Sequence, residues 1–348
     1  MNKLFKLVFF VSLGLYFITE LPMVSASPQQ GAKSEIKEYP WFKDSFLDLP
    51  EDLAEAAENN RGLILYFHQE GCPYCKKLLN DNFRRPALVN KLTARYDFIE
   101  LNMWGDRSVI DIDGSQLTEK TLAVKLKVMF TPTLIFIDSS GKIEFRLNGY
   151  YSPYKFNTLL DYLASERSMT FSQYFRQIDK KLPKEAQTNV MAMQETNDYA
   201  SLYQQSNKPM LLILDEKNCK DCIELYANLN SSEAFKQLTD KFTITRLPIN
   251  SKQIITNING KKLKASEWAD ELKVQYTPSL LFFESGQEVG NGVNETFRLA
   301  SYVKKFHLES VLLYIANKKY DEYPEFQRYI HDRTAKMREM GIKFDLWK

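Results

Sequence analysis

The segment "LILYFHQEGCPYCKKLL", residues 63–79, decides the fold of this chain. It begins with a short run of apolar and aromatic residues, a pattern typical of a strand that is buried on both faces. Two cysteines with two residues between them follow, and the residues after them have a helical pattern. Pro73 fits this interpretation, because a helix accommodates proline in its first turn. The segment therefore predicts a buried strand and then a helix that begins at Cys72.

The same arrangement returns in the second half of the chain as "LLILDEKNCKDCIEL", residues 211–225. The two cysteine pairs are 147 positions apart. A Thr-Pro dipeptide follows each pair at nearly the same interval, Thr131-Pro132 in "VMFTPTLIFID" and Thr277-Pro278 in "VQYTPSLLFFE". This internal duplication predicts two copies of one domain, which suits a chain of 348 residues.

Each copy alternates strand-like apolar runs with helix-like segments, which predicts an α/β fold with a mixed sheet flanked by helices. We place copy one at residues 36–168 and copy two at residues 193–318. Residues 169–192 form a linker that we expect to be helical in part. Residues 319–348 form a tail without a counterpart between the copies, which we expect to be helical and to pack on copy two.

The first 26 residues have the pattern of a secretory signal peptide. Two lysines precede an apolar run over residues 7–18, and the small residues "VSA" at 24–26 offer a cleavage site. An uncleaved anchor is the alternative, but a membrane span needs about 20 apolar residues, and Glu20 and Pro22 end this run too early. We therefore expect an exported mature chain that does not span a membrane.

The sequence leaves two compartments open for the exported chain. Asn-x-Ser/Thr triplets at Asn230 and Asn294 keep a relative from the endoplasmic reticulum open. The C-terminal "FDLWK" lacks a retention signal, so we expect a bacterial periplasm. In an oxidising compartment, two close pairs with no other cysteine indicate working pairs rather than a structural framework.

Charge and cysteine spacing disfavour several classes of protein. The chain has 46 basic and 44 acidic residues, whereas a dedicated nucleic-acid binder usually has a basic excess. A zinc ribbon needs two CxxC pairs about 15–20 residues apart, so only an inter-domain site with four thiolates stays as a metal alternative. A c-type haem needs histidine after the second cysteine, where Lys76 and Ile223 stand. We expect no metal and no cofactor, and an inert structural disulfide stays open for each pair.

The strand, the CxxC that opens a helix and the Thr-Pro before a second strand together resemble the thioredoxin superfamily. The resemblance covers nearly all of both copies. Copy one, with "PWFKDSFLDLPEDLAEAAENNRGLILYFHQEGCPYC" and "FTPTLIFIDSSGK", is most similar to the exported SoxW-type thioredoxin-like proteins of bacteria. The resemblance implies two tandem thioredoxin-like domains, each a central mixed sheet flanked by helices.

The resemblance also implies catalytic roles for all four cysteines. Cys72 and Cys219 begin helices, where unpaired N–H groups and the helix dipole favour the attacking thiolate. Cys75 and Cys222 lie three residues further on and resolve the mixed disulfide.

The Thr-Pro positions are the substrate-binding candidates. Pro132 and Pro278 match a proline that is cis in the superfamily, and a cis X-Pro bond is uncommon enough to test the resemblance. The resemblance implies that each proline lies beside its cysteine pair. There, the backbone of Thr131 or Thr277 would face an extended substrate.

Both copies depart from the usual thioredoxin pattern. The tryptophan before the first cysteine is replaced by Gly71 and Asn218. The buried carboxylate six residues before that cysteine is replaced by Tyr66 and Ile213, so proton transfer must use another group.

Four nearby side chains are candidates for that proton transfer or for thiolate activation. Glu70, Asp215 and Glu216 could accept the proton, or could be solvated charges at a strand end. His68 could help to form the Cys72 thiolate, or could be structural.

The dipeptides inside the CxxC motifs differ, Pro73-Tyr74 being neutral and Lys220-Asp221 charged, so the two pairs should differ in redox potential. We expect an exported thiol–disulfide oxidoreductase that reduces disulfides of client proteins or small thiols, with a membrane thiol reductase as its electron donor. A relay between the two pairs is a hypothesis. A disulfide isomerase or oxidase is one alternative, and a redox-inert, chaperone-like peptide-binding module is the other.

Overall fold

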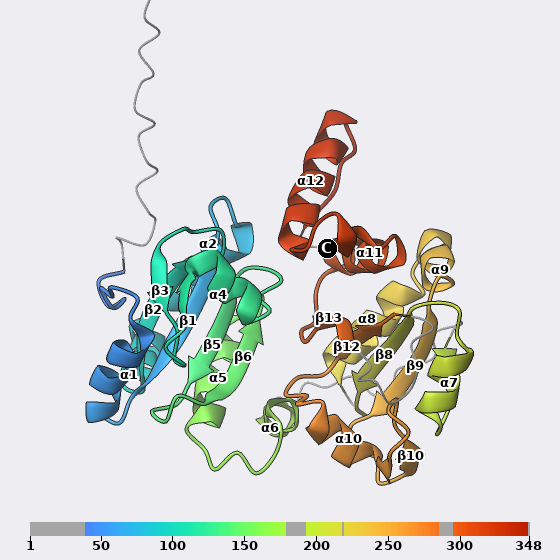
Figure 1. The fold of residues 1–348 in the computed structure, drawn as a ribbon, viewed down its shortest axis with the longest axis horizontal. Helices are drawn as coiled ribbons and strands as arrows, with labels where there is room; N and C mark the ends of the chain where they lie inside the picture. The colour runs from blue at the N-terminus through green and yellow to red at the C-terminus, as the bar shows by residue number, and fades with distance from the viewer. Residues whose placement is uncertain (1–38, 179–192, 218, 285–294, 347–348) are drawn as a thin grey trace, which may run out of the picture. The chain divides into compact units, whose positions relative to one another are not determined.

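Each copy builds its sheet around the strand that precedes its cysteine pair, as seen in the computed structural model (Figure 1). The structure describes residues 39–178, 193–217, 219–284 and 295–346. The predicted signal peptide and position 218 therefore lie outside the described residues. Both copies belong to the compact unit Pro40–Lys348.

Copy one has a four-stranded mixed sheet in the order β2-β1-β5-β6, with β1 parallel to β2 and antiparallel to β5. Its elements are α1 (Leu49–Glu58), β1 (Gly62–His68), α2 (Pro73–Leu78), the π-helical η2 (Leu79–Phe83), α3 (Pro86–Thr93), β2 (Tyr96–Asn102), β3 (Ser108–Ile110), β4 (Gln116–Thr118), α4 (Glu119–Lys125), β5 (Thr133–Ile137), β6 (Ile143–Asn148) and α5 (Pro153–Leu163).

Both faces of β1 are buried, which explains its unbroken apolar sequence. Leu63, Leu65 and Phe67 share one core cluster with residues of α1 and α4. Tyr66 points to the other face because side chains alternate along a strand, and its ring lies 5.6 Å from that of Phe98. The strand is thereby fixed on two sides, and the loop after it holds the first cysteine pair.

Copy two repeats this sheet with one more strand at its edge, in the order β13-β12-β8-β9-β7. Its elements are β7 (Met193–Gln194), α7 (Tyr199–Gln205), β8 (Met210–Asp215), α8 (Lys220–Leu229), α9 (Glu233–Thr239), β9 (Thr243–Pro248), β10 (Ile254–Thr256), β11 (Lys262–Lys264), α10 (Ala265–Glu271), β12 (Ser279–Phe283), β13 (Glu295–Leu299) and α11 (Lys305–Ala316). The predicted fold class, two tandem α/β copies with mixed sheets, is confirmed.

Four short features escaped the sequence patterns. Helices α3 and α9 stand between the CxxC helix and the next strand, and the pairs β3/β4 and β10/β11 form small hairpins. Each hairpin strand has three residues, too few for an alternating pattern to stand out.

The linker and the tail both contain helices. The described part of the linker holds α6 (Phe171–Ile178), and the tail holds the 3₁₀ turn η3 (Lys319–Asp321) and α12 (Phe326–Glu339). Phe326 of α12 packs into the core of copy two, with its ring 5.3 Å from that of Phe297. In the described parts of the chain, no helix has the length and apolar character needed to cross a membrane.

His307 of α11 gives the protein a predicted acid sensitivity. Its ring lies 5.4 Å from the ring of Tyr74, and burial together with nearby Arg333 lowers the pKa of His307 to about 4 from 6.5. Between these values the unfolded chain binds a proton that the folded chain does not. The free energy of unfolding therefore keeps the contribution of His307 above pH 6.5 and loses it as the pH falls toward 4.

Replacing His307 with Leu should remove this contribution. The shift corresponds to about 3 kcal/mol, and the partial solvent contact of the ring reduces the expected effect to about 2 kcal/mol. Urea unfolding at pH 7, 5.5 and 4.5 measures it. The variant should lose less stability than the parent between pH 7 and 4.5, and parallel losses in both proteins would contradict the assignment.

Two candidate redox centres

The first centre is the pair Cys72 and Cys75, joined by a disulfide at the start of α2. Cys72 is the N-cap of the helix, and its Sγ accepts the N–H of Cys75 at 3.1 Å. Both residues are buried. The expected position of Cys72 at a helix N-terminus is confirmed, with Pro73 in the first turn.

Thr131 lies directly against the first centre. Its hydroxyl donates to the Sγ of Cys72 at 3.3 Å, and its carbonyl oxygen lies 3.7 Å from the same sulfur. The bond to Pro132 is cis, which confirms the expectation. The structure thus brings Cys72, Thr131 and Pro132 together, as predicted from sequence.

The second centre, Cys219 and Cys222, repeats this geometry at the start of α8. The Sγ of Cys219 accepts the N–H of Cys222 at 3.1 Å and lies 3.6 Å from the carbonyl oxygen of Thr277. The Thr277–Pro278 bond is also cis, as expected. Cys219 and Cys222 are buried.

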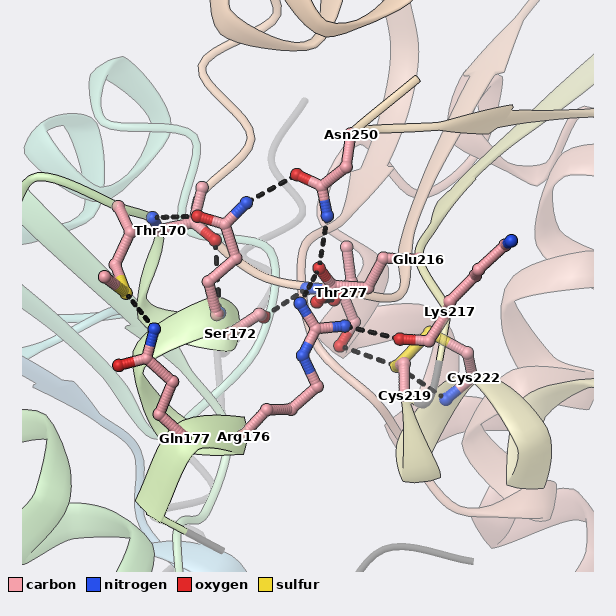
Figure 2. A network of polar contacts seen from close by, with 12 residues as sticks. Thr170, Ser172, Arg176, Gln177, Glu216, Lys217, Cys219, Cys222, Asn250 and Thr277 are labelled. Carbon is pink, nitrogen blue, oxygen red and sulfur yellow. Dashed lines mark hydrogen bonds and ion pairs between the residues drawn. A yellow bond between two sulfur atoms is a disulfide. The ribbon is translucent and has the colours of Figure 1, made fainter. Parts of the chain in front are cut away.

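The two centres differ in the use of their threonine hydroxyls. The hydroxyl of Thr277 donates to Glu216 instead of to a cysteine sulfur (Figure 2). Glu216 also pairs with Arg176 of α6 and accepts the side-chain N–H of Asn250 at 3.0 Å. Burial raises the pKa of the Glu216 carboxyl, and these partners offset only part of that effect.

Copy one has a neutral version of this arrangement. Gln69 takes the position of Glu216 directly after the strand, and its side-chain oxygen accepts the indole N–H of Trp104 at 2.7 Å. No carboxylate competes for the hydroxyl of Thr131, so this hydroxyl donates to the sulfur of Cys72. The first centre is therefore arranged to stabilise a thiolate more directly than the second.

The charged candidates at the strand ends have mixed outcomes. Glu70 is exposed, as a solvated charge should be. Asp215 and Glu216 are buried, so the solvated interpretation is wrong for both. The reason is compensation: each carboxylate has an arginine partner, and a buried charge needs such a partner.

The polar pairs behind the two centres carry their acidic residue on opposite strands. The Nε2 of His68 lies 2.8 Å from Glu100 in copy one. At the matching place in copy two, Asp215 lies 2.8 Å from Arg246 and accepts the hydroxyl of Tyr226 at 2.6 Å.

Each CxxC motif also contacts a group from outside its own domain. The hydroxyl of Tyr74, inside the first CxxC, donates to the backbone oxygen of Leu346 in the tail. Lys155 of α5 lies 2.9 Å from Asp221, inside the second CxxC. Burial alone would raise the pKa of Asp221, but Lys155 and the Tyr276 hydroxyl outweigh it and hold that pKa below its usual value.

Sequence patterns gave no signal for several of these residues. Ser172, whose hydroxyl accepts the N–H of Thr277 at 2.9 Å, and Arg176 lie in the linker, which has no repeated counterpart. Lys155 and Asn250 carry no motif. Among the described residues, no group of three or more His, Cys, Asp or Glu side chains is placed to hold a metal ion.

A comparison with protein families matches residues 49–164 and 197–316 to the model of a thioredoxin-like domain. No curated protein is similar enough in sequence to match.

Several solved structures are similar to about a third of this chain. One is a thioredoxin-fold protein from Helicobacter pylori, at 22% identity over 38% of this chain and 84% of that one, with a TM-score of 0.31. Another is a thioredoxin from Thermus thermophilus, at 26% identity over 35% and 87%, with a TM-score of 0.28. A third is the oxidised C-terminal domain of DsbD from Neisseria meningitidis, at 14% identity over 32% and 86%, with a TM-score of 0.24.

Proposed function

Because this chain belongs to the thioredoxin-like domain family, with one copy of the domain in each half, we propose that it is a thiol–disulfide oxidoreductase. The observation that carries the proposal is the environment of Cys72. Its sulfur receives a backbone N–H from Cys75 and a hydroxyl from Thr131, at the positive end of a helix. In the reduced protein these groups stabilise a thiolate, which is the nucleophile in disulfide exchange.

The exchange proceeds in two steps at the first centre. The Cys72 thiolate attacks one sulfur of a substrate disulfide, whose S–S bond breaks as a mixed disulfide forms, and the other substrate sulfur leaves as a thiolate that takes up a proton. Cys75 then loses its proton and attacks the Sγ of Cys72, which releases the second substrate thiolate. The protein ends with the Cys72–Cys75 disulfide, having passed two electrons to the substrate.

The finer parts of the proposal rest on sequence. The signal-peptide pattern and the SoxW resemblance support an exported, periplasmic protein with a reductive role. A dithiol donor must then reduce the Cys72–Cys75 disulfide after each turnover, and a membrane thiol reductase is the donor class that we propose. Its clients would be proteins or small thiols that carry disulfides.

Trapping tests the proposal. The Cys75→Ala variant cannot resolve the mixed disulfide, so expression in its own cell envelope should leave clients joined to Cys72. Non-reducing gels and mass spectrometry identify the complexes, which should dissolve in dithiothreitol. The Cys72→Ala, Cys75→Ala variant is the matched control, because it keeps the second centre and lacks the attacking sulfur.

Equal adduct yields in the trap and the control would contradict an exchange reaction at Cys72. A first centre that dithiothreitol barely reduces would instead favour the redox-inert binding module. A reduction potential near or above about −200 mV would support the enzyme. The relay hypothesis is tested separately, because Cys219→Ala, Cys222→Ala should slow turnover at Cys72 if electrons pass between the centres.

A further inference from the structure

The backbone of Thr277 beside the second centre already has a partner within the chain. Its N–H donates to the hydroxyl of Ser172 at 2.9 Å (Figure 2). Ser172 is buried and lies near the start of α6. At the first centre, the N–H of Thr131 has no hydrogen-bond partner among the described residues. The backbone N–H of Thr277 beside Cys219 is therefore occupied, whereas the corresponding N–H of Thr131 beside Cys72 is open.

Arg176 fixes α6 in this position. One guanidinium nitrogen pairs with the buried carboxylate of Glu216, and another donates to the backbone oxygen of Lys217 at 2.6 Å. Phe171 holds the other side of α6, with its ring 5.7 Å from that of Phe145 in copy one. The helix thus lies against the second centre as a fixed cover.

The cover divides the space around the second centre into two cavities. The smaller, of about 270 Å³, contains Cys219 in its wall together with Lys155, Phe175 and Lys220. The larger, of about 920 Å³, is lined by no cysteine. Arg176 and Glu216 line both cavities, so their ion pair belongs to the wall between them.

We propose that α6 restricts the second centre to small-molecule disulfides, and that Ser172 and Arg176 are the residues that set this specificity. An extended polypeptide binds an open backbone edge through main-chain hydrogen bonds, and Ser172 already occupies the N–H of Thr277. A cavity of about 270 Å³ is close to the lower end of the range of small-molecule sites, about 300–1,000 Å³. Lys220 at its wall favours a disulfide that carries carboxylates.

The inference rests on the proposed thiol–disulfide exchange and assigns it a substrate class at the second centre. Reduced Cys219 attacks one sulfur of the small disulfide, the S–S bond breaks, and one small thiol leaves with a proton. Cys222 loses its proton and displaces the second small thiol from Cys219. The two electrons come from the Cys219–Cys222 dithiol, which a dithiol reductant restores.

The experiment uses full-length protein with Cys72→Ser and Cys75→Ser, so that only the second centre can react. The protein is reduced, freed of reductant and mixed with either oxidised glutathione or insulin, and its remaining thiols are counted over time by alkylation and mass spectrometry. The release variant adds Ser172→Ala and Arg176→Glu, which removes the hydroxyl and places a carboxylate beside Glu216. Hydrogen exchange at Thr277 reports whether α6 has separated.

One further variant serves as the matched control for the release variant. Gln177→Glu adds a negative charge at an exposed neighbour on the same helix and should behave as the parent.

The expected result is a selective gain of protein substrate. The release variant should react with insulin at least about tenfold faster than the parent, a factor typical of one removed hydrogen bond or ion pair. Its rate with oxidised glutathione should not rise, because Arg176→Glu adds negative charge to the wall of the cavity that takes this anionic disulfide. Faster exchange at Thr277 should accompany the gain.

Three results would overturn the inference. In the first, insulin oxidises the thiols of the parent as fast as those of the release variant. In the second, the rates with insulin and with oxidised glutathione change by the same factor. The third is a second centre that reacts with neither probe in either variant. The first centre separates this from failure of the proposed function, because protein with Cys219→Ser and Cys222→Ser should still reduce insulin if exchange at Cys72 is correct.

Discussion

Replacing Thr131 with Val should slow the alkylation of reduced Cys72 by iodoacetamide about ten- to a hundredfold below the titration midpoint of its thiol. The valine keeps the shape of the side chain and removes the hydroxyl that lies 3.3 Å from the Cys72 sulfur. A hydrogen bond to a charged group contributes about 1.5–3 kcal/mol, which is about ten- to a hundredfold in thiolate population. Insulin reduction by the first centre should fall in parallel, because the thiolate attacks.

Copy two provides the matched control for this prediction. The hydroxyl of Thr277 donates to Glu216, so Thr277→Val should leave the alkylation rate of Cys219 within about threefold of the parent. The assay follows each reduced cysteine by mass spectrometry across pH 5 to 9. A Thr131→Val protein whose Cys72 reacts at the parental rate would show that the hydroxyl does not stabilise the thiolate.

Replacing Arg246 with Met should destabilise copy two by about 3–5 kcal/mol, the usual cost of leaving one member of a buried ion pair alone. Asp215 is fully buried, and Arg246 lies 2.8 Å from its carboxylate. After the replacement, the Tyr226 hydroxyl still donates a hydrogen bond to that carboxylate, but the arginine that paired with it is gone. Hydrogen exchange measures the loss, because amides of β8 and β9 should exchange faster while those of β1 and β2 keep their rates.

A second variant separates the charge from the packing of the arginine. Adding Asp215→Asn to Arg246→Met removes the unpaired carboxylate and should recover at least about half of the lost stability. The two residues are in contact, so their effects should not add. If the double variant is as unstable as the sum of the single variants, the ion pair does not explain the cost.

The sequence was sufficient for the fold and for the four cysteines because those features rest on local patterns. The buried strand, the CxxC and the Thr-Pro each occupy a few consecutive residues, and the duplication presents every one of them twice. The cis bonds at Pro132 and Pro278 followed from the family resemblance. Each of these predictions needed only one segment or its repeat.

The contacts around the second centre could not be predicted from any single segment of the sequence. Ser172 and Arg176 act on Thr277 and Glu216, which lie far along the chain, and the linker has no repeat to compare. Glu216 looked solvated because a strand end is usually exposed. Its burial depends on partners from α6 and from the loop after β9, so only the folded chain reveals it.

The exchanged positions of the acidic residue in the two polar pairs bear on how a chain with two similar halves assembles correctly. In each half the pair joins the strand before the cysteines to its parallel neighbour, His68 with Glu100 and Asp215 with Arg246. If a strand of one half paired with the partner strand of the other, Asp215 would meet Glu100, and His68 would meet Arg246. The first encounter brings two carboxylates together, the second leaves Arg246 without its carboxylate, and such exchange between similar domains is a characteristic misfolding route. The swapped charges therefore favour pairing of each half with itself during folding.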